Sequence, residues 1–433
     1  MRAAAEHRTR MLWLAGLLHG FTHAYNVALL PLYLLVQHDF NFESVSKATS
    51  FVTVMMVAYF LPSYPMGVLA DRANRKTLLT WGLVLNALAF IGLSFAPSYP
   101  WALAAAIVAG IGGSVYHPTA TAMVARLCPV NTGRALGLVG MGAGAGFFLG
   151  PLYAGWRATM LVPALGAAAW RRPVLELGVM GLLAAALFAW LADHERPETE
   201  DDRVKTRPAP AGPGLFPTAA LWLFFVACCF LFSLRDFAGA GMASLTSLFL
   251  QKARGFNPGE AGLALGGIYL ASVFGNPLLG GLSDRARKRW ILTVLIIGAA
   301  LIALLPHARG LWIVPCLVLF GFFFMASFPM VEAAVMQSVP DAVRGRVFGF
   351  YVTVTGLIGN LAHWIVGVQI KHLGAAASEP GRYYPVYGAL AVFVLLALAG
   401  LPCLHAIRKR EHLDEAAAMP AGAAVTATKP VEP

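Results

Sequence analysis

The chain has 433 residues, of which 58% are hydrophobic and only 12% are charged. Soluble globular proteins carry about 25% charged residues, so this composition excludes an ordinary soluble fold and indicates a membrane protein. The formal net charge of +11 does not indicate nucleic-acid binding, because the basic residues are confined to short segments between apolar runs. Basic segments in such places are typical topology signals.

Long apolar runs recur along the chain, each near the ~20 residues that a helix needs to cross a bilayer. They predict an all-α membrane protein with twelve transmembrane helices. The first run follows Arg8 and Arg10 and is longer than the apolar region of a signal peptide, so it is expected to be a span. The seventh is too long for one straight crossing, so part of it should be kinked or interfacial. The expected spans are 11–36, 45–69, 77–96, 101–126, 133–156, 173–192, 217–250, 260–282, 290–306, 311–338, 344–370 and 383–407.

A polar, Pro-rich segment, "DHERPETEDDRVKTRPAPAGPG", separates the sixth and seventh spans. This composition is typical of a flexible linker. The Ala- and Pro-rich C-terminus predicts disorder. The expected organisation is an N-terminal six-helix bundle at 1–192, a cytoplasmic linker at 193–216, a C-terminal six-helix bundle at 217–410 and a disordered cytoplasmic tail at 411–433.

The basic residues also predict an orientation. If both termini are cytoplasmic, 22 of the 32 Lys and Arg residues lie in or next to the inside loops and 9 in or next to the outside loops, and Arg235 alone lies deep within a span. Excess Lys and Arg on the cytoplasmic side is the usual rule. We therefore expect a multi-pass protein of the cell inner membrane with both termini in the cytoplasm.

The two halves of the sequence repeat each other. "GVLADRANRK" at 67–76 returns as "GGLSDRARKR" at 280–289, and "CPVNTGRALG" at 128–137 returns as "VPDAVRGRVFG" at 339–349. A same-direction repeat of six spans predicts two similar bundles related by an axis along the membrane normal. A substrate is then expected to bind between them.

The repeated loop resembles the signature between spans 2 and 3 of the major facilitator superfamily, and the resemblance extends over nearly the whole chain. The matching residues are Gly67, Asp71, Arg72 and Arg75, and in the second copy Gly280, Asp284 and Arg285. Asn74 stands where the family usually has Gly, and Asn tolerates the same left-handed turn. The resemblance implies the major facilitator fold and a conformational role for these residues; the alternative is a simple basic cytoplasmic loop.

A second resemblance lies in the fifth span, "GLVGMGAGAGFFLGPLYAG" at 137–155. Gly146, Gly150 and Pro151 stand at the spacing of the motif that marks exporters of this superfamily, and Ala154 replaces one of its glycines. Small residues allow close helix packing, and Pro151 is expected to add a kink. Ordinary Gly-rich helix packing is the alternative.

The fourth span, "GIGGSVYHPTATAMVARLCP" at 110–129, resembles the fosmidomycin-resistance branch and related drug-efflux members. Many proton-coupled drug exporters carry an Arg in this span. Here the corresponding positions hold Ala106 and Val108, so proton coupling through that Arg is not expected.

The resemblance implies that spans 1, 4, 7 and 10 line a central cavity, and most embedded polar residues fall on these spans. The spacing of His19, His23 and Asn26 places them on one helix face. The expected substrate-binding residues are His19, His23, Asn26, His117, Thr121 and Arg235, and the expected proton-coupling residues are His23, His117, Asp236 and Glu332. The alternatives are interhelical hydrogen bonding by each His and mutual pairing of Arg235 with Asp236; helix geometry favours partners on other helices for those two. Gln337 of span 10 belongs to the same polar faces, and Asn360 and His363 of span 11 are weaker candidates.

These features predict a secondary active transporter that exports a small organic molecule, drug-like or anionic, by alternating access with proton antiport. A proton-coupled metabolite importer is the alternative, and a non-transporting membrane sensor is a more distant one. The sequence has no Walker-type phosphate loop and no nucleophile–base pair, so neither direct use of ATP nor an enzyme is expected. Its five cysteines lack metal-ligand spacing, and no cofactor or metal is expected. The expected partners are the small-molecule substrate, protons and the lipid bilayer, and the protein is expected to be a monomer.

Overall fold

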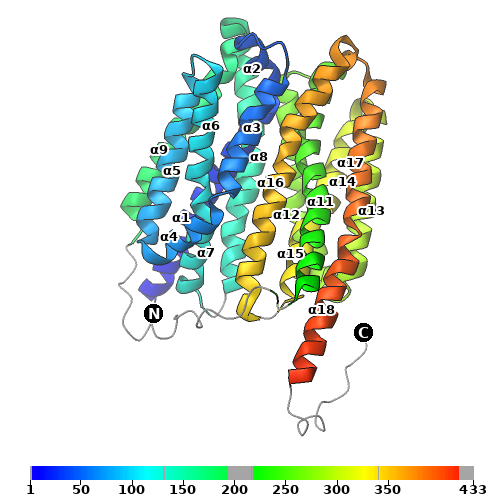
Figure 1. Cartoon of the computed structure of the whole chain (residues 1–433). Coiled ribbons are helices and arrows are strands. Elements are labelled where there is room, and N and C mark those ends of the chain that lie inside the picture. Colours follow the sequence, from blue (N-terminus) through cyan, green and yellow to red (C-terminus); the bar gives the residue numbers. More distant parts are fainter. Residues whose placement is uncertain (1, 130–131, 194–215, 217, 340, 419–433) are drawn as a thin grey trace.

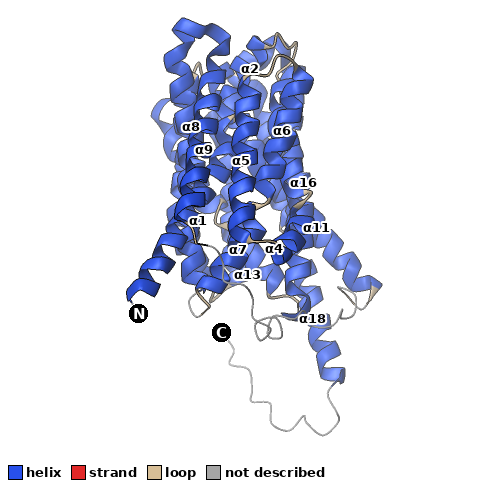
Figure 2. Ribbon diagram, turned by 90° about the vertical axis from the view of Figure 1, so that its left-hand side faces the viewer, coloured by secondary structure: helices blue, strands red, loops and turns tan. Residues whose placement is uncertain are grey.

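The computed structural model describes residues 2–129, 132–193, 216, 218–339 and 341–418. These residues form helices joined by short loops (Figure 2), which confirms the all-α prediction. The helices stand in two bundles: the first half of the chain, blue to cyan, lies beside the second half, green to red (Figure 1).

Each of the expected spans coincides with one helix or with two or three consecutive helices separated by short breaks. The N-terminal bundle contains α1 (Arg2–Ala28), η1 (Leu30–Leu32), α2 (Tyr33–Asp39), α3 (Ser46–Phe60), α4 (Ser63–Arg72), α5 (Arg75–Ser94), α6 (Tyr99–Ser114), α7 (Tyr116–Leu127), α8 (Thr132–Leu165), η2 (Gly166–Trp170) and α9 (Arg171–Leu191). The C-terminal bundle contains α11 (Ala219–Ala253), α12 (Pro258–Ser283), α13 (Arg287–Leu304), η3 (Leu305–His307), η4 (Gly310–Trp312), α14 (Ile313–Phe324), α15 (Ser327–Met336), α16 (Asp341–Leu373), η5 (Gly374–Ser378), η6 (Pro380–Tyr383), α17 (Tyr384–Ala397) and α18 (Gly400–Ala418).

Among the described residues, 9 helical stretches are long and apolar enough to cross a membrane. The number is 10 if the bent pair α3 and α4 is counted as one span. One of these stretches, Arg134–Leu191, joins α8 and α9 in 58 residues and is long enough for two crossings. Large apolar side chains point outward, as lipid-facing positions require: Leu311 is 89% exposed and Trp190 is 79% exposed. The chain is a multi-span membrane protein.

Prolines explain why several spans are broken. A proline removes the hydrogen bond to the carbonyl four residues earlier and crowds that carbonyl. Accordingly, α6 ends at Ser114, four residues before Pro118, and α14 ends at Phe324, five residues before Pro329. The fourth and tenth spans are therefore broken at corresponding places in the two bundles.

The seventh span is one continuous helix. Helix α11 runs unbroken for 35 residues without an internal proline. The Thr218 side chain caps it by accepting a hydrogen bond from the Leu221 N–H. A helix of this length extends about 50 Å, which exceeds a hydrocarbon layer of about 30 Å. The helix is therefore longer than the hydrocarbon layer is thick, and the expectation that part of it is kinked or interfacial stays a prediction. Helix α18 also continues past residue 411, where the tail was expected to begin.

The two bundles meet at one end, which we call the distal end because it lies away from the start of α1 and the last turns of α18 (Figure 1). There α8 packs on α12: a Cβ at Gly155 would collide with the Pro258 carbonyl oxygen. Nearer the other end, a Cβ built at Gly137 or Gly140 of α8, or at Gly280 or Gly281 of α12, meets nothing within 4 Å. Between these ends the two helices stay in contact as far as Gly144, whose Cβ would lie 2.7 Å from Val273, and Phe147 stacks on Tyr269 at 4.9 Å.

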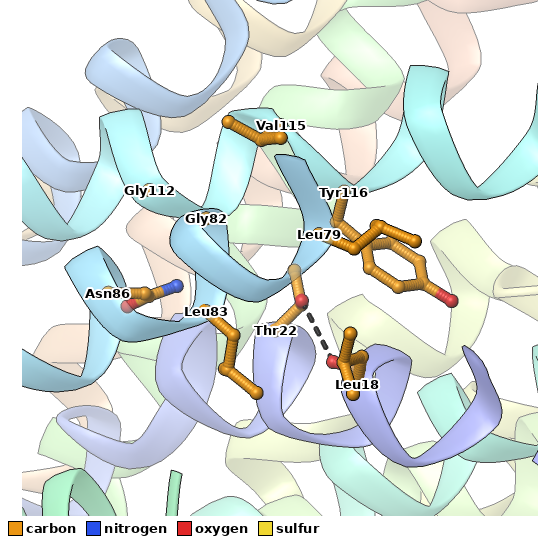
Figure 3. A pocket seen from close by; sticks show the side chains of 9 residues that line it. All are labelled: Leu18, Thr22, Leu79, Gly82, Leu83, Asn86, Gly112, Val115 and Tyr116. Atoms are coloured by element: carbon orange, nitrogen blue, oxygen red, sulfur yellow. Dashed lines mark hydrogen bonds between the residues drawn. The ribbon is translucent and has the colours of Figure 1, made fainter. Parts of the chain in front are cut away.

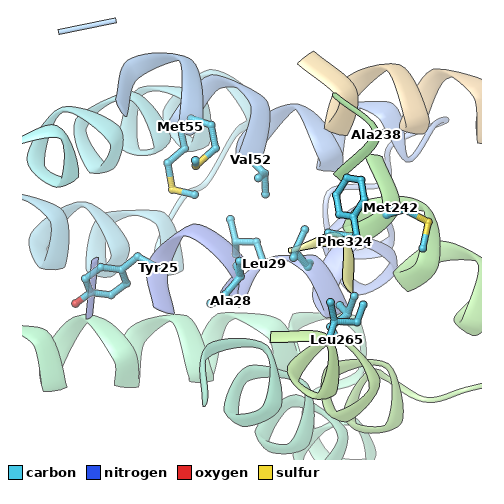
Figure 4. Packing of buried hydrophobic residues seen from close by; sticks show 14 of the residues in the cluster. Tyr25, Ala28, Leu29, Val52, Met55, Ala238, Met242, Leu265 and Phe324 are labelled. Atoms are coloured by element: carbon cyan, nitrogen blue, oxygen red, sulfur yellow. The ribbon is translucent and has the colours of Figure 1, made fainter. Parts of the chain in front are cut away.

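A continuous set of buried apolar side chains fills the bundles and extends across their junction. Figure 4 shows part of it, with Leu29 and Val52 of the N-terminal bundle near Leu265 and Phe324 of the C-terminal bundle. These four side chains are at most 2% exposed.

Candidate functional site

Three imidazoles gather in the N-terminal bundle. His19 and His23 lie one turn apart on α1, and His117 lies on α7, directly after the break in the fourth span. The Nε2 atoms of His19 and His23 are 3.1 Å apart. The His117 ring centroid is 5.1 Å from that of His19 and 5.4 Å from that of His23. The structure thus brings together all three histidines that the sequence singled out on spans 1 and 4; we call them the His cluster.

Aromatic rings hold this cluster in place. Tyr116 stacks on His19 at 4.6 Å and donates a hydrogen bond of 2.7 Å to the Ala15 carbonyl of α1. Phe147 of α8 stacks on His23 at 4.2 Å. The sequence does not single out Tyr116 or Phe147, because aromatic residues in apolar helices usually serve only packing.

The access of the three rings to solvent differs. His19 and His23 are partly buried, whereas His117 is exposed. Thr121, one turn after His117, is also exposed, and Asn26, one turn after His23, is buried. The cluster therefore has a covered side on α1 and an open side on α7.

A second polar cluster lies in the C-terminal bundle around Arg235. Its guanidinium forms an ion pair of 2.5 Å with Asp236 and donates a hydrogen bond of 3.1 Å to the Ser327 carbonyl. Its Nη2 lies 3.5 Å from the Tyr351 hydroxyl oxygen. Arg235 therefore has the partners on other helices that helix geometry predicts, and its long side chain also reaches back to Asp236. Arg235 is 1% exposed, and each of its three guanidinium nitrogens has a partner.

The remaining acidic candidate belongs to the same cluster. Glu332 of α15 lies within electrostatic range of Arg235 and Asp236, while Gln337 at the end of α15 is exposed. Phe328 places its ring centroid 4.3 Å from the Arg235 guanidinium carbon. Phe328 precedes Pro329 as His117 precedes Pro118, so corresponding places in the broken spans hold one member of each cluster.

A third polar group joins the bundles at the distal end. The Tyr33 hydroxyl oxygen lies 2.9 Å from the Ser244 hydroxyl oxygen, which lies 2.7 Å from Nδ1 of His363. Nε2 of His363 lies 3.3 Å from the Asn360 side-chain oxygen. Tyr33, Ser244 and His363 are buried, and Asn360 is partly buried. His363 and Asn360, the weaker candidates of the sequence, thus belong to the contact between the bundles.

The exporter-like motif of α8 is a packing surface toward α1. A Cβ at Gly142 or Gly146 would collide with the carbonyl oxygen of Gly16 or Gly20, respectively. A Cβ at Gly150 would lie 2.8 Å from the Ala24 carbonyl oxygen. The other side of the helix faces α12, where the Pro151 carbonyl leaves no room for a Cβ at Gly262. Close approach of backbones therefore requires these small residues, and α8 continues through Pro151 without a break.

The loop between α4 and α5 corrects one expectation. Asn74 has a φ of −65°, not a left-handed value, and its side chain caps α5 by accepting a hydrogen bond of 3.1 Å from the Thr77 N–H. In the second copy, Asp284 pairs with Arg287 at 2.6 Å. The Asp71 side chain lies outside the described residues. A Cβ at Gly67 would make only ordinary contact, at 3.9 Å from Pro118.

A small cavity lies behind the His cluster, between α1, α5 and the broken fourth span (Figure 3). It measures about 220 Å³ with its mouth included and is lined by Leu18, Thr22, Leu79, Gly82, Leu83, Asn86, Gly112, Val115 and Tyr116. Its lining is mostly apolar, and the hydroxyl of Thr22 is bonded to its own helix. The substrate candidates of α1 point away from it, since none of them lines it.

Comparison with known proteins agrees with this architecture. The Major Facilitator Superfamily profile matches residues 12–363. The fosmidomycin resistance protein of Escherichia coli K12 is 23% identical over 370 residues, covering 84% of this chain and 88% of that protein. The multi-drug resistance efflux pump PmrA of Streptococcus pneumoniae is 24% identical over 409 residues, covering 89% and 92%.

Solved structures share the fold. A bacterial homologue of the human lysosomal transporter Spinster, in an inward-facing and unoccupied conformation, superposes with a TM-score of 0.72 at 16% identity, covering 94% of this chain and 98% of that one. Tetrameric PepTSo2 superposes with a TM-score of 0.66 at 14% identity, covering 94% of this chain and 99% of that one. The sequence match over most of the chain, together with this fold, places the protein: it belongs to the Major Facilitator Superfamily.

Proposed function

We propose that this member of the superfamily is a secondary active exporter of a small organic molecule, with both termini in the cytoplasm. The observation that carries the proposal is the tight closure between the bundles at the distal end. It is formed by the Tyr33–Ser244 contact and by the close packing of α8 on α12 at Gly155 and Gly262. Alternating access requires such a closure to open while the other end closes.

The relatives favour efflux of drug-like solutes as the direction and substrate class. Two of them are named for fosmidomycin resistance and multi-drug efflux. The solute would bind between the bundles against His23, His117 and Thr121 on one side. Arg235 is buried in its ion pair in this conformation, so it would act on an anionic solute only after that pair rearranges.

Proton antiport is the drive we propose. His is the side chain that titrates near neutral pH, so His23 and His117 are candidates in one bundle. Asp236 and Glu332 are the candidates in the other, where they share one cation, Arg235. The chain acts as a monomer in this proposal, with residues 1–192 and 217–410 moving as two bodies about the linker at 193–216.

A transport screen in inside-out membrane vesicles tests the proposal. Radiolabelled phosphonates, carboxylates and cationic dyes are offered outside vesicles whose interior is made acidic. We expect accumulation of at least one solute that collapses when a protonophore removes the pH gradient. Vesicles carrying equal amounts of the Gly262→Val variant, in which the distal closure is disrupted, are the matched control. Uptake that is identical in the variant, or that ignores the protonophore, contradicts the proposal.

A further inference from the structure

The His cluster has a property that binding of an organic solute does not explain. One ligand-capable nitrogen from each of His19, His23 and His117 lies within 4.8 Å of the other two. Three imidazoles are the ligand set of open Zn²⁺ sites, which keep a fourth position for water or another ligand. We propose that these three histidines form a binding site for a divalent transition-metal ion of the Zn²⁺, Co²⁺ and Ni²⁺ class.

The spacing of the nitrogens fits such an ion. In a tetrahedral site with Zn–N bonds of about 2.0–2.1 Å, two ligand nitrogens lie about 3.3 Å apart. The Nε2 atoms of His19 and His23 are already 3.1 Å apart, and they point at each other. His117 is the more distant member, and its ring lies beside those of His19 and His23. Metal binding at all three nitrogens would need the His117 ring to turn toward the pair.

The hydrogen bond made by the second ring nitrogen of His19 is typical of metal-bound histidines. Nδ1 of His19 lies 3.0 Å from the Val139 carbonyl oxygen. A carbonyl can only accept, so Nδ1 of a neutral His19 carries the hydrogen and Nε2 keeps its lone pair. Metal-bound histidines usually donate their other N–H to a carbonyl or carboxylate in this way, which fixes the ring orientation. Tyr116, stacked on the same ring, adds a second restraint.

The cluster is incomplete without a further ligand. Nδ1 of His23 is buried and has no hydrogen-bond partner among the described residues. Because Nδ1 of His19 carries its hydrogen, the hydrogen between the facing Nε2 atoms is on His23, and the unused lone pair is that of His23 Nδ1. When a metal ion binds both Nε2 atoms, this hydrogen moves to Nδ1 of His23 or is released to solvent, and both Nε2 lone pairs become ligands. The fourth position then faces the open side of the cluster, next to His117 and Thr121, where water or an oxygen donor of a solute can enter.

Equilibrium metal binding tests the inference without any transport. The full-length protein is purified in detergent without a polyhistidine tag, and Co²⁺ is titrated while its visible d–d absorption is recorded. We expect one equivalent of Co²⁺ with a tetrahedral spectrum, displaced by Zn²⁺. His117→Ala, which leaves no cavity because this ring is exposed, should lower the Zn²⁺ affinity at least about 100-fold, since loss of even a second-shell partner costs 10–100-fold. His307→Ala and His405→Ala, which remove exposed rings elsewhere, are the matched controls.

A cysteine variant keeps the test independent of folding effects. His23→Cys retains a metal ligand, so it should bind Co²⁺ and add a sulfur-to-cobalt charge-transfer absorption, whereas His23→Ala should not bind. Absence of a tetrahedral spectrum in the wild type, or binding that His117→Ala and His307→Ala reduce equally, overturns the inference. Because no transport is measured, failure here leaves the exporter proposal standing, and a failed transport screen leaves the metal site standing.

Discussion

The hydroxyl of Thr53 on α3 joins the two bundles by contacting Asn360 and Trp364 on α16. It donates a hydrogen bond of 3.2 Å to the Asn360 carbonyl oxygen and accepts one of 2.9 Å from the Trp364 N–H. Thr53 is 7% exposed, so water does not readily replace these bonds. This single side chain therefore contributes to the closure of the distal end.

Thr53→Val should weaken that closure while keeping the shape of the side chain. Loss of a hydrogen bond costs about 1 kcal/mol, which corresponds to about a fivefold shift toward the conformation open at the distal end. The readout is labelling of a Thr49→Cys reporter, buried at the same contact, by a membrane-impermeant thiol reagent in whole cells. Ser50→Ala is the control, because the Ser50 hydroxyl bonds within its own bundle, to Lys47 and Tyr99. Equal labelling of the two variants would show that Thr53 does not hold the closure.

Gly262→Val should open the distal end more strongly. Its added side chain would meet the Pro151 carbonyl of the other bundle, whereas a side chain at Gly267, five residues further along α12, meets nothing within 4 Å. Overpacking costs about 1–3 kcal/mol, which corresponds to about a 5- to 150-fold change, so transport should fall by at least about fivefold. Gly267→Val should transport within twofold of the wild type. Equal rates in the two variants would contradict the described contact of α8 with α12.

Gly146→Ala should destabilise the N-terminal bundle. Its Cβ would collide with the Gly20 carbonyl of α1, and the resulting strain should lower thermal stability by about 1–3 kcal/mol. Gly140→Ala, at an open position of the same helix, should be neutral or slightly stabilising, since Ala favours helix by about 1 kcal/mol over Gly. Thermal unfolding of the purified variants, followed by size-exclusion chromatography, measures both. A melting temperature lowered equally by both substitutions would refute the argument.

The Arg235–Asp236 ion pair predicts non-additive stability. Removing one partner of a buried pair leaves an uncompensated charge and costs about 3–5 kcal/mol. Arg235→Met and Asp236→Asn should each lower stability in that range, with the partly exposed Asp236 at the lower end. The double variant should be less destabilised than the sum of the two, because neither charge then remains. Strictly additive losses in thermal unfolding would mean that the two side chains do not depend on each other.

The sequence predicted the parts of this protein that depend on local pattern. Apolar runs predicted the spans, and the i, i+4 spacing placed His19 and His23 together. The spacing within α1 does not predict the position of His117, because His117 lies on another span and reaches His19 and His23 only through tertiary packing. The aromatic residues Tyr116 and Phe147 were missed because their spacing also fits plain packing.

Departures from expectation have physical causes of their own. Helix directions 100° apart predict partners on other helices, which Arg235 has in Ser327 and Tyr351, but its long flexible side chain also reaches Asp236. Analogy with Gly predicts a left-handed turn at Asn74; the residue instead uses its side-chain oxygen as a helix cap. The role of Asp71 in conformational change stays a prediction.

A reversible cross-link at the distal end tests the central claim, that the two bundles must separate there during transport. A Cβ at Gly259 of α12 would lie 3.3 Å from Oγ1 of Thr159 on α8, close to the roughly 3 Å between a Cβ and the opposite sulfur of a disulfide. Transport is measured for the Thr159→Cys, Gly259→Cys double variant after oxidation and again after reduction, with each single variant treated alike. We expect the oxidised double variant to be inactive, reduction to restore it, and the single variants to be unaffected. Wild-type transport by the fully cross-linked protein would contradict the account.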